Sequence, residues 1–237
     1  MEEYNLQEIR IEDYNSIKEY YQKRRPETAD SNILDLYIWL NCYPTWYFTN
    51  DKGLMWVAKS EDGQYYSSIP CCKDEDLKEC FLETQKYFNE VLQKKLVMYV
   101  VDKAAVDLLQ LPEDEYVVVP DRTYADYVYD AEKLRTFSGK KYHKKKNHLN
   151  AFKREYEGRY EFKFLSKKDE PEILAFLEDW KKHKSDTEEH EFIDSEAVGI
   201  KYILEHEEVF DYKIGAVYVD NKLEAFTIGN YESREDM

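Results

Sequence analysis

One order of predicted elements occurs twice in this chain: a strand, two helices and a β-hairpin. In the first half, hydrophobic periodicity and turn residues predict these elements at residues 8–11, 17–22, 33–41, 46–49 and 54–59. In the second half, they predict them at residues 160–165, 171–181, 195–205, 214–219 and 223–228. The halves share little sequence identity, so the repetition is one of order and spacing. It predicts a mixed α+β protein with two related folds in tandem.

The first copy continues beyond its hairpin, whereas the second does not. After a short strand at 65–69, the first copy has a predicted amphipathic helix and then two strands around a short helix, at residues 73–93, 96–101, 104–109 and 116–119. The second copy ends seven residues after Asn230, which would leave a hairpin edge unpaired. We therefore expect either a longer gene product or another element that covers this edge.

The composition is that of a folded protein without a visible export or membrane signal. Hydrophobic residues make up 43% of the 237 residues, and 22 tyrosines with 11 phenylalanines exclude a disordered acidic chain. The N-terminus has no basic region followed by an apolar run, and the longest apolar run, residues 96–101, is too short to span a bilayer. We expect a cytoplasmic protein. Its four cysteines form no CxxC pair, so reduced thiols are favoured over a zinc site.

Positive charge is concentrated on one segment of this acidic chain. The formal net charge is −16, yet residues 133–154 hold nine lysines and arginines, two histidines and no acid. Asp130 can cap a short helix that ends at Ser138-Gly139, and a second helix is predicted over residues 140–157, ending at Gly158. An apolar stripe forms one side of the second helix. The other side and its flank carry the candidate phosphate-binding residues Lys140, Lys141, His143, Lys144, Asn147, His148 and Arg154.

Two interpretations of this basic face remain open. In one, the lysines pair with acidic folds on either side, and the helix is an interdomain strut. In the other, the face binds phosphates, because no acid within the helix is spaced to neutralise the lysines and because asparagine and histidine accompany them. No base-reading motif is present, so nucleic acid would be recognised by shape and backbone. Lys145 lies near the apolar stripe, where we expect it to meet a carboxylate.

The sequence "DYVYDAEKLRTFSGKKYHKKKNHLNAFKREY", residues 126–156, resembles the signature region of proteins related to the C-terminal domain of phosphatidylglycerol lysyltransferase. The resemblance extends through "FIDSEAVGIKYIL" and "IGAVYVDNKLEAFTIGNY". It implies two tandem folds of the GCN5-related N-acyltransferase type, joined by a basic helix, with the second fold incomplete. The implied parts are a first acyltransferase-like domain at 1–129, a helical basic connector at 130–158 and the N-terminal part of a second domain at 159–237.

The resemblance also implies a class of activity. Better-understood relatives move an aminoacyl group from aminoacyl-tRNA to a lipid or a peptidoglycan precursor. The membrane-spanning part of the lipid-modifying enzymes is absent from this sequence, and no Gln/Arg-x-x-Gly-x-Gly loop for the pyrophosphate of an acyl-CoA is visible. The acceptor, a small molecule or a lipid headgroup, and the oligomeric state stay open.

Residues 180–196, "WKKHKSDTEEHEFIDSE", hold two histidines and several acids. His183 and His190 lie seven residues apart, without the H-E-x-x-H spacing of a helical zinc site, so we expect no metal. An exposed acidic loop is favoured, and a substrate-contacting loop that includes Glu196 is the alternative. No Ser-His-Asp or Cys-His set is present to identify catalytic residues.

Three functional hypotheses follow. The leading one is an acyltransferase-like protein that transfers an aminoacyl group from a tRNA bound on the basic helix. The second is an N-acyltransferase for small molecules that uses acyl-CoA. The third is a non-catalytic binding protein that retains the fold and uses the basic helix as a strut.

Overall fold

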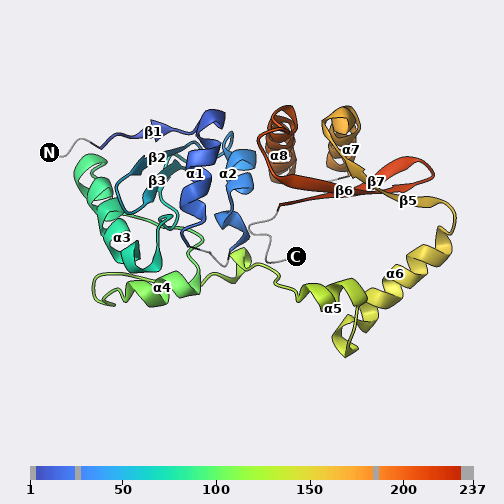
Figure 1. The fold of residues 1–237 in the computed structure, drawn as a ribbon, viewed down its shortest axis with the longest axis horizontal. Helices are drawn as coiled ribbons and strands as arrows, with labels where there is room; N and C mark the ends of the chain where they lie inside the picture. The colour runs from blue at the N-terminus through green and yellow to red at the C-terminus, as the bar shows by residue number, and fades with distance from the viewer. Residues whose placement is uncertain (1–3, 25–27, 184–186, 231–237) are drawn as a thin grey trace. The chain divides into compact units, whose positions relative to one another are not determined.

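The structure, a computed structural model, describes residues 4–24, 28–183 and 187–230, without the side chains of residues 187–191. The chain divides into two compact units, Met1–Asp126 and Tyr127–Met237, and each unit contains one antiparallel sheet (Figure 1). The predicted mixed α+β class is therefore confirmed.

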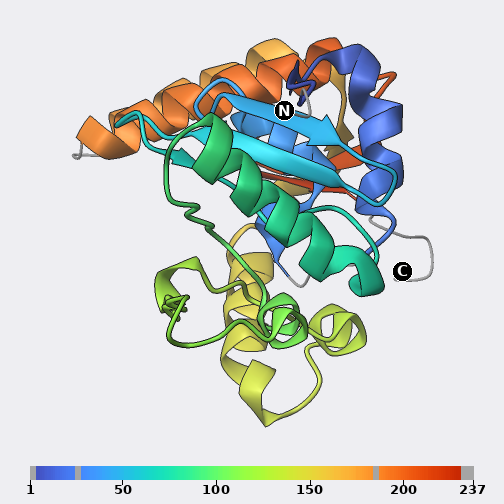
Figure 2. The ribbon, with the colours of Figure 1, turned by 90° about the vertical axis from the view of Figure 1, so that its left-hand side faces the viewer.

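The first unit contains an antiparallel sheet with helices on both of its faces. Its strands lie in chain order: β1 (Gln7–Glu8), β2 (Thr45–Thr49), β3 (Leu54–Lys59) and β4 (Tyr65–Tyr66). Helices α1 (Tyr14–Tyr21) and α2 (Ile33–Trp39) lie on one side of β2 and β3, and α3 (Leu77–Lys86) lies on the other (Figure 1, Figure 2). Because both faces are covered, β3 is buried along almost its whole length, which explains its continuous apolar run.

The predicted β2–β3 hairpin is confirmed, and its turn explains why it forms. Oδ1 of Asn50 accepts hydrogen bonds from the backbone N–H groups of Lys52 and Gly53, both at 2.9 Å. This side chain thereby satisfies two backbone donors in the turn. Gly53 also packs against the core so closely that a Cβ there would lie 2.7 Å from Cβ of Cys72.

The helix predicted over residues 73–93 is shorter and less regular than expected. It consists of a 3₁₀ turn at Asp74–Asp76, the α-helix α3, and a π-helical turn at Tyr87–Val91. Tyr87 and Phe88 at this last turn are both buried in the core of the unit. Helix α4 (Lys103–Leu109) is found where it was predicted.

Two strands predicted for the first unit do not form. The strand predicted at 96–101 is reduced to a single parallel bridge between Ser67 and Met98. Residues 116–119 are not a strand, and Val117 is 87% exposed. Their β-branched side chains favour extended backbone, but a strand needs a neighbour, and the sheet described in this unit ends at β4.

The second unit contains a three-stranded sheet with two helices on one face. The strands β5 (Tyr160–Leu165), β6 (Tyr212–Val219) and β7 (Lys222–Asn230) lie in chain order, and Asp220 and Asn221 turn between β6 and β7 with φ of 50° and 63°. Helices α7 (Glu170–Lys182) and α8 (Thr187–Glu205) pack on the sheet (Figure 1). The buried core between them contains Leu165, Ile173, Leu177, Ile200, Leu204, Ile214 and Ala216.

The repeated order of elements is confirmed. In each unit a strand is followed by two helices and a hairpin, and the first strand pairs with the first strand of that hairpin. The pairing gives the equivalent strand orders β1-β2-β3 and β5-β6-β7. The tandem arrangement therefore extends from element order to sheet topology.

Candidate functional site

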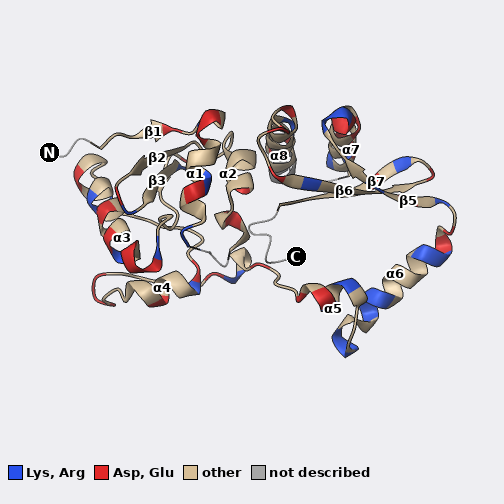
Figure 3. Cartoon of the chain, viewed as in Figure 1, with Lys and Arg blue, Asp and Glu red and all other residues tan. Residues whose placement is uncertain are grey.

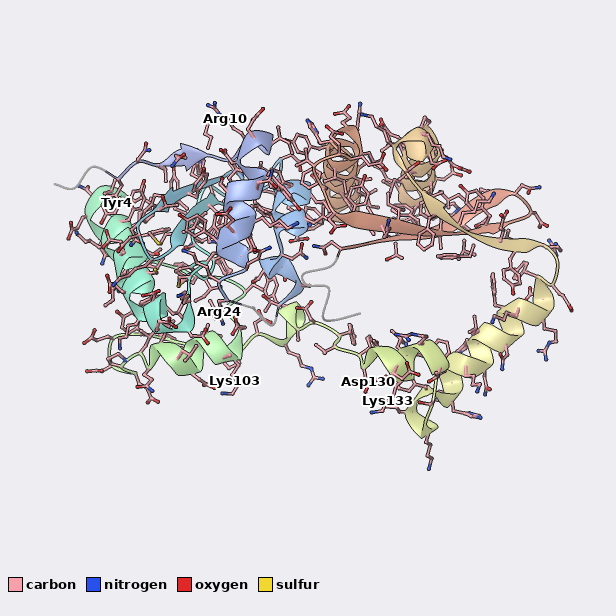
Figure 4. The ribbon with its side chains drawn as sticks, in the orientation of Figure 1. Tyr4, Arg10, Arg24, Lys103, Asp130 and Lys133 are labelled. Carbon is pink, nitrogen blue, oxygen red and sulfur yellow. The ribbon has the colours of Figure 1, made fainter. Side chains whose placement is uncertain are left out.

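The basic segment begins the second unit with two helices, whose ends are set by local sequence. The first is α5 (Ala131–Thr136), where Oδ1 of Asp130 accepts a hydrogen bond from the backbone N–H of Lys133 at 2.9 Å (Figure 4). After Gly139, with φ of 92°, a 3₁₀ turn at Lys140–Tyr142 leads into α6 (His143–Glu155). Gly158, with φ of 72°, lies just beyond α6. The predicted helix cap at Asp130, the break at Ser138-Gly139 and the helix end at Gly158 are therefore confirmed.

The seven candidate phosphate-binding residues lie together on this segment, and all are exposed. Asn147 and His143 are one helical turn apart, with Nδ2 and Nδ1 at 3.4 Å. The cationic side chains form a basic run along α6 (Figure 3). Lys140, Lys141, Lys144 and Arg154 make no ion pair with any described acid of the second unit.

Helix α5 provides a contrast within the same segment. Lys133 pairs with Asp130 at 3.2 Å, and Arg135 pairs with Glu132 at 3.2 Å. Positive charge is therefore neutralised locally on α5 and left open to solvent on α6.

Within the second unit, Lys145 does not meet the carboxylate that was predicted for it. Its Nζ instead lies 5.9 Å from the centroid of the Tyr129 ring, and the side chain is exposed. A cation over an aromatic face gains electrostatic energy without the loss of hydration that a buried ion pair demands. Lys145 therefore adds to the positive charge of α6.

Aromatic contacts hold the apolar side of α6. Tyr142 is buried, and its ring lies 6.3 Å from that of Phe137. The ring of Phe152 lies 5.0 Å from Tyr156 and 5.3 Å from Tyr160, the first residue of β5. These contacts connect the basic helix to the edge of the sheet within one unit.

Glu196 lies in helix α8, within the predicted helix at 195–205, whereas the loop expected before it is corrected. Helix α7 extends to Lys182 and α8 begins at Thr187, so the expected loop at 180–196 is mostly helical. Burial raises the pKa of the half-buried Glu196 carboxyl. The side chains of Asp186 and of residues 188–191 lie outside those described. The described side chains contain no group of three or more potential ligands that could hold a metal ion.

A cavity of about 300 Å³ between α7 and the start of β7 was not predicted. Its lining includes Glu172, Phe176, Asp179, Trp180, His183 and Lys222. Beside it, the Tyr218 hydroxyl donates to Oε2 of Glu172 at 2.5 Å, and burial followed by this bond raises the pKa of Tyr218 to about 12. The sequence has no signal for this cavity, because the helix and the hairpin that line it are about forty residues apart.

None of the helices in the described part of the chain could serve as a membrane span. Even α8, which is 19 residues long, carries several acids and a lysine along its length.

Comparisons with known proteins place the chain in a family. The family model for "Phosphatidylglycerol lysyltransferase, C-terminal" matches residues 21–236. A crystal structure of a conserved protein of unknown function from Bacteroides thetaiotaomicron is similar, with a TM-score of 0.83 and 25% identity over 96% of this chain and 75% of that chain.

An uncharacterized protein of Mycoplasmoides gallisepticum, MYCGA3080, is 28% identical over 100 residues. That match spans 42% of this chain and about a third of the relative's length (32%). The family match, in contrast, extends over nearly the whole chain. The chain therefore belongs to the family of the phosphatidylglycerol lysyltransferase C-terminal domain.

Proposed function

We propose that this protein is an acyltransferase-like enzyme that takes an aminoacyl group from aminoacyl-tRNA and transfers it to an acceptor still to be identified. Helix α6 binds the phosphate backbone of the donor. The family supports the class of reaction, since its name specifies a lysyltransferase. A tRNA donor places the activity in the cytoplasm.

The observation that carries the proposal is the unpaired charge of α6. In a chain of net charge −16, cations have an excess of potential carboxylate partners. Those of α5 have carboxylate partners, whereas Lys140, Lys141 and Lys144 have none among the described residues of the second unit. An exposed row of cations with Asn147 and two histidines is suited to phosphate oxygens.

The chemistry makes modest demands on the protein. The ester of an aminoacyl-tRNA is already reactive, so orientation of the amine or hydroxyl nucleophile and stabilisation of the developing oxyanion can supply most of the acceleration. If the nucleophile is an ammonium ion, it must first lose a proton. Glu196 is the proposed substrate-contacting residue because it begins the family-like sequence Glu-Ala-Val-Gly-Ile, and burial raises the pKa of its carboxyl.

The test is tRNA binding measured by fluorescence anisotropy across a salt series, with charged and uncharged tRNA. Wild-type protein should bind charged tRNA more tightly, and the affinity should fall steeply with salt. The Lys141→Ala/Lys144→Ala variant should bind more weakly, with a log–log salt slope shallower by about 1.4–1.8, since each lost phosphate contact removes roughly 0.7–0.9. The matched control is Lys78→Ala/Lys95→Ala, which removes two exposed lysines of the first unit.

The alternatives predict different results. An acyl-CoA enzyme would show saturable acyl-CoA binding that both lysine variants leave unchanged. A strut would lose stability in Lys141→Ala/Lys144→Ala without any change in ligand binding. Absence of tRNA binding by the wild-type protein at low salt would refute the proposal.

A further inference from the structure

We propose that the outer edge of strand β5 pairs with the same edge of a second copy of this chain, around a two-fold axis at Phe162. The two three-stranded sheets then join into one sheet across the dimer. This inference goes beyond the proposed function, because it requires neither a nucleic acid nor an acyl donor. It assigns an interaction surface to the protein and identifies the partner as a second copy of the same chain.

Strand β5 is the outer strand of its sheet. One side of β5 pairs with β6, and the other side has no neighbouring strand in the described part of the second unit. The equivalent strand of the first unit, β1, is also an outer strand, so this position follows from the shared topology and not from what covers either face of the sheet. However, β1 has two residues, whereas β5 has six. A very short edge strand offers little to pair with, but an edge of six residues can accept another strand.

The hydrogen bonds of the sheet show which backbone groups of β5 point outward. The N–H of Asp220 donates to the carbonyl oxygen of Arg159 at 2.9 Å, so these two residues form a hydrogen-bonded pair next to the β5–β6 ladder. Such pairs alternate with non-hydrogen-bonded pairs along an antiparallel ladder. The N–H and C=O groups of Tyr160, Phe162 and Phe164 therefore point away from β6. In the described part of the second unit, none of them bonds to another backbone segment.

A two-fold axis at Phe162 matches all three outward-pointing residues. When two β5 strands pair antiparallel in this register, Phe162 faces Phe162 of the second copy, and Tyr160 faces Phe164 of the second copy. Each of these pairs exchanges two N–H···O bonds, because the groups on both strands point toward each other. The three rings lie on one side of the strand, so the same register also places aromatic side chains opposite each other.

The charges of β5 are complementary to themselves in this register. Glu161 and Lys163 lie on the other side of the strand, with Oε2 and Nζ 3.0 Å apart, and their side chains are 61% and 42% exposed. The axis places Glu161 opposite Lys163 of the second copy as a non-hydrogen-bonded pair, with Cα atoms about 4.5 Å apart. Four charges of alternating sign then meet across the interface. A lysine on an edge strand normally opposes pairing, but here it faces a glutamate, so charge favours this partner and this register.

Sedimentation of the whole chain across a concentration series tests the interface. At 0.15 M salt, where exposed charges more than about 8 Å apart are screened, the wild type should reach twice the monomer mass of 28.6 kDa. Glu161→Lys and Lys163→Glu each place like charges opposite each other, so each should weaken dimerisation about tenfold or more. The double swap Glu161→Lys/Lys163→Glu restores opposite charges and should dimerise like the wild type.

A mixture of the two single variants gives the most specific result. In a mixed dimer, each lysine of one β5 strand faces a glutamate of the other, so the mixture should dimerise although each variant alone does not. This result would also show that both variants are folded. The matched control is Glu224→Lys, which makes the same charge reversal at an exposed position of β7 and should leave dimerisation unchanged.

A disulfide tests the position of the axis. Phe162 faces its own copy with Cα atoms about 5.5 Å apart, a separation that a disulfide can span. Phe162→Cys should therefore form a covalent dimer on treatment with diamide, which takes up the two thiol hydrogens. Phe164→Cys carries its thiol at a more exposed position, 68% against 57%, but faces Tyr160 of the second copy and should not cross-link. The wild type, with four cysteines, measures the background.

Several results would overturn the inference. They are a wild type that stays monomeric at every concentration, a dimer that both single charge variants leave intact, and a mixture of those variants that stays monomeric. Equal cross-linking of Phe162→Cys and Phe164→Cys would exclude the axis at Phe162. Because tRNA binding is measured separately, a failure here leaves the proposed function standing, and the reverse also holds.

Discussion

Replacement of Asp35 by asparagine should stabilise the first unit, and the gain should depend on pH. Asp35 lies on α2, where its Oδ1 accepts a hydrogen bond from Nε1 of Trp39 at 3.1 Å. Burial, followed by repulsion from Asp30, raises the pKa of this carboxyl from 3.8 to about 7. Asparagine keeps an oxygen acceptor for Trp39 and has no charge to bury.

The sign and size of the effect follow from proton linkage. The folded-state pKa of Asp35 lies above its unfolded value, so the folded state holds the proton more tightly, and stability falls as pH rises from about 4 to about 7. At about 1.4 kcal/mol per pKa unit, the shift corresponds to about 4 kcal/mol as an upper limit. Asp35→Asn should therefore match the wild type near pH 4. It should exceed the wild type by about 2–4 kcal/mol at pH 8.

Urea unfolding followed by tryptophan fluorescence measures this difference. Three of the four tryptophans, Trp39, Trp46 and Trp56, belong to the first unit, so the signal reports mainly on its unfolding. The control is Asp51→Asn, which neutralises an exposed carboxylate of the same unit and should leave the pH profile unchanged. A stability difference between Asp35→Asn and the wild type that is constant from pH 4 to pH 8 would refute the reasoning.

Two other substitutions in the first unit should lower its free energy of unfolding. Arg24→Ala removes the partner of Asp102, whose carboxylate is 2% exposed and 2.6 Å from Nη2, and should cost about 3–5 kcal/mol in urea unfolding. A loss below about 1 kcal/mol would show that Asp102 finds another partner. Gly53→Ala would place a Cβ 2.7 Å from Cβ of Cys72 and should cost about 1–3 kcal/mol, whereas Gly229→Ala meets nothing within 4 Å and should be neutral. Equal midpoints for these two alanine variants would contradict the packing argument.

The sequence predicts the parts of the fold that depend on local chemistry. The strand at 54–59 and the strand at 160–165 have the predicted bounds, because turn residues and side-chain alternation set them directly. The same holds for Asp130 as a helix cap and for Gly158 as a helix end. Repeated order then predicted two equivalent sheets, because each hairpin and its preceding strand form one pairing unit.

The predictions failed where contacts with other segments of the chain decide the local structure. The valine-rich segment at 116–119 has strand propensity, but its side chains stay exposed because no strand pairs with it in the described structure. Lys145 was expected to require a carboxylate, yet a tyrosine ring from the preceding segment occupies that position. The residues predicted for the basic face of α6 are all exposed. Whether its charges are paired or open depends on tertiary neighbours, which periodicity does not specify.

Strand β5 shows that side-chain alternation can mislead about which side of a strand faces the core. Its sequence, Tyr-Glu-Phe-Lys-Phe-Leu, alternates rings with charges, a pattern that predicts the rings against the helices and the charges in water. The structure has the reverse. Lys163 lies on the helix-covered side, with Nζ 4.4 Å from the centroid of the Tyr218 ring, whereas Phe162 and Phe164 face away from α7 and α8.

This orientation leaves apolar area in water, at a cost of about 25 cal/mol for each Å² that a partner could cover. The buried core described for the second unit lies on the helix-covered side and does not include these two phenylalanines. In the first unit, α3 covers the corresponding face of the β1-β2-β3 sheet (Figure 1, Figure 2), so an apolar face on β5 follows from the repeated topology.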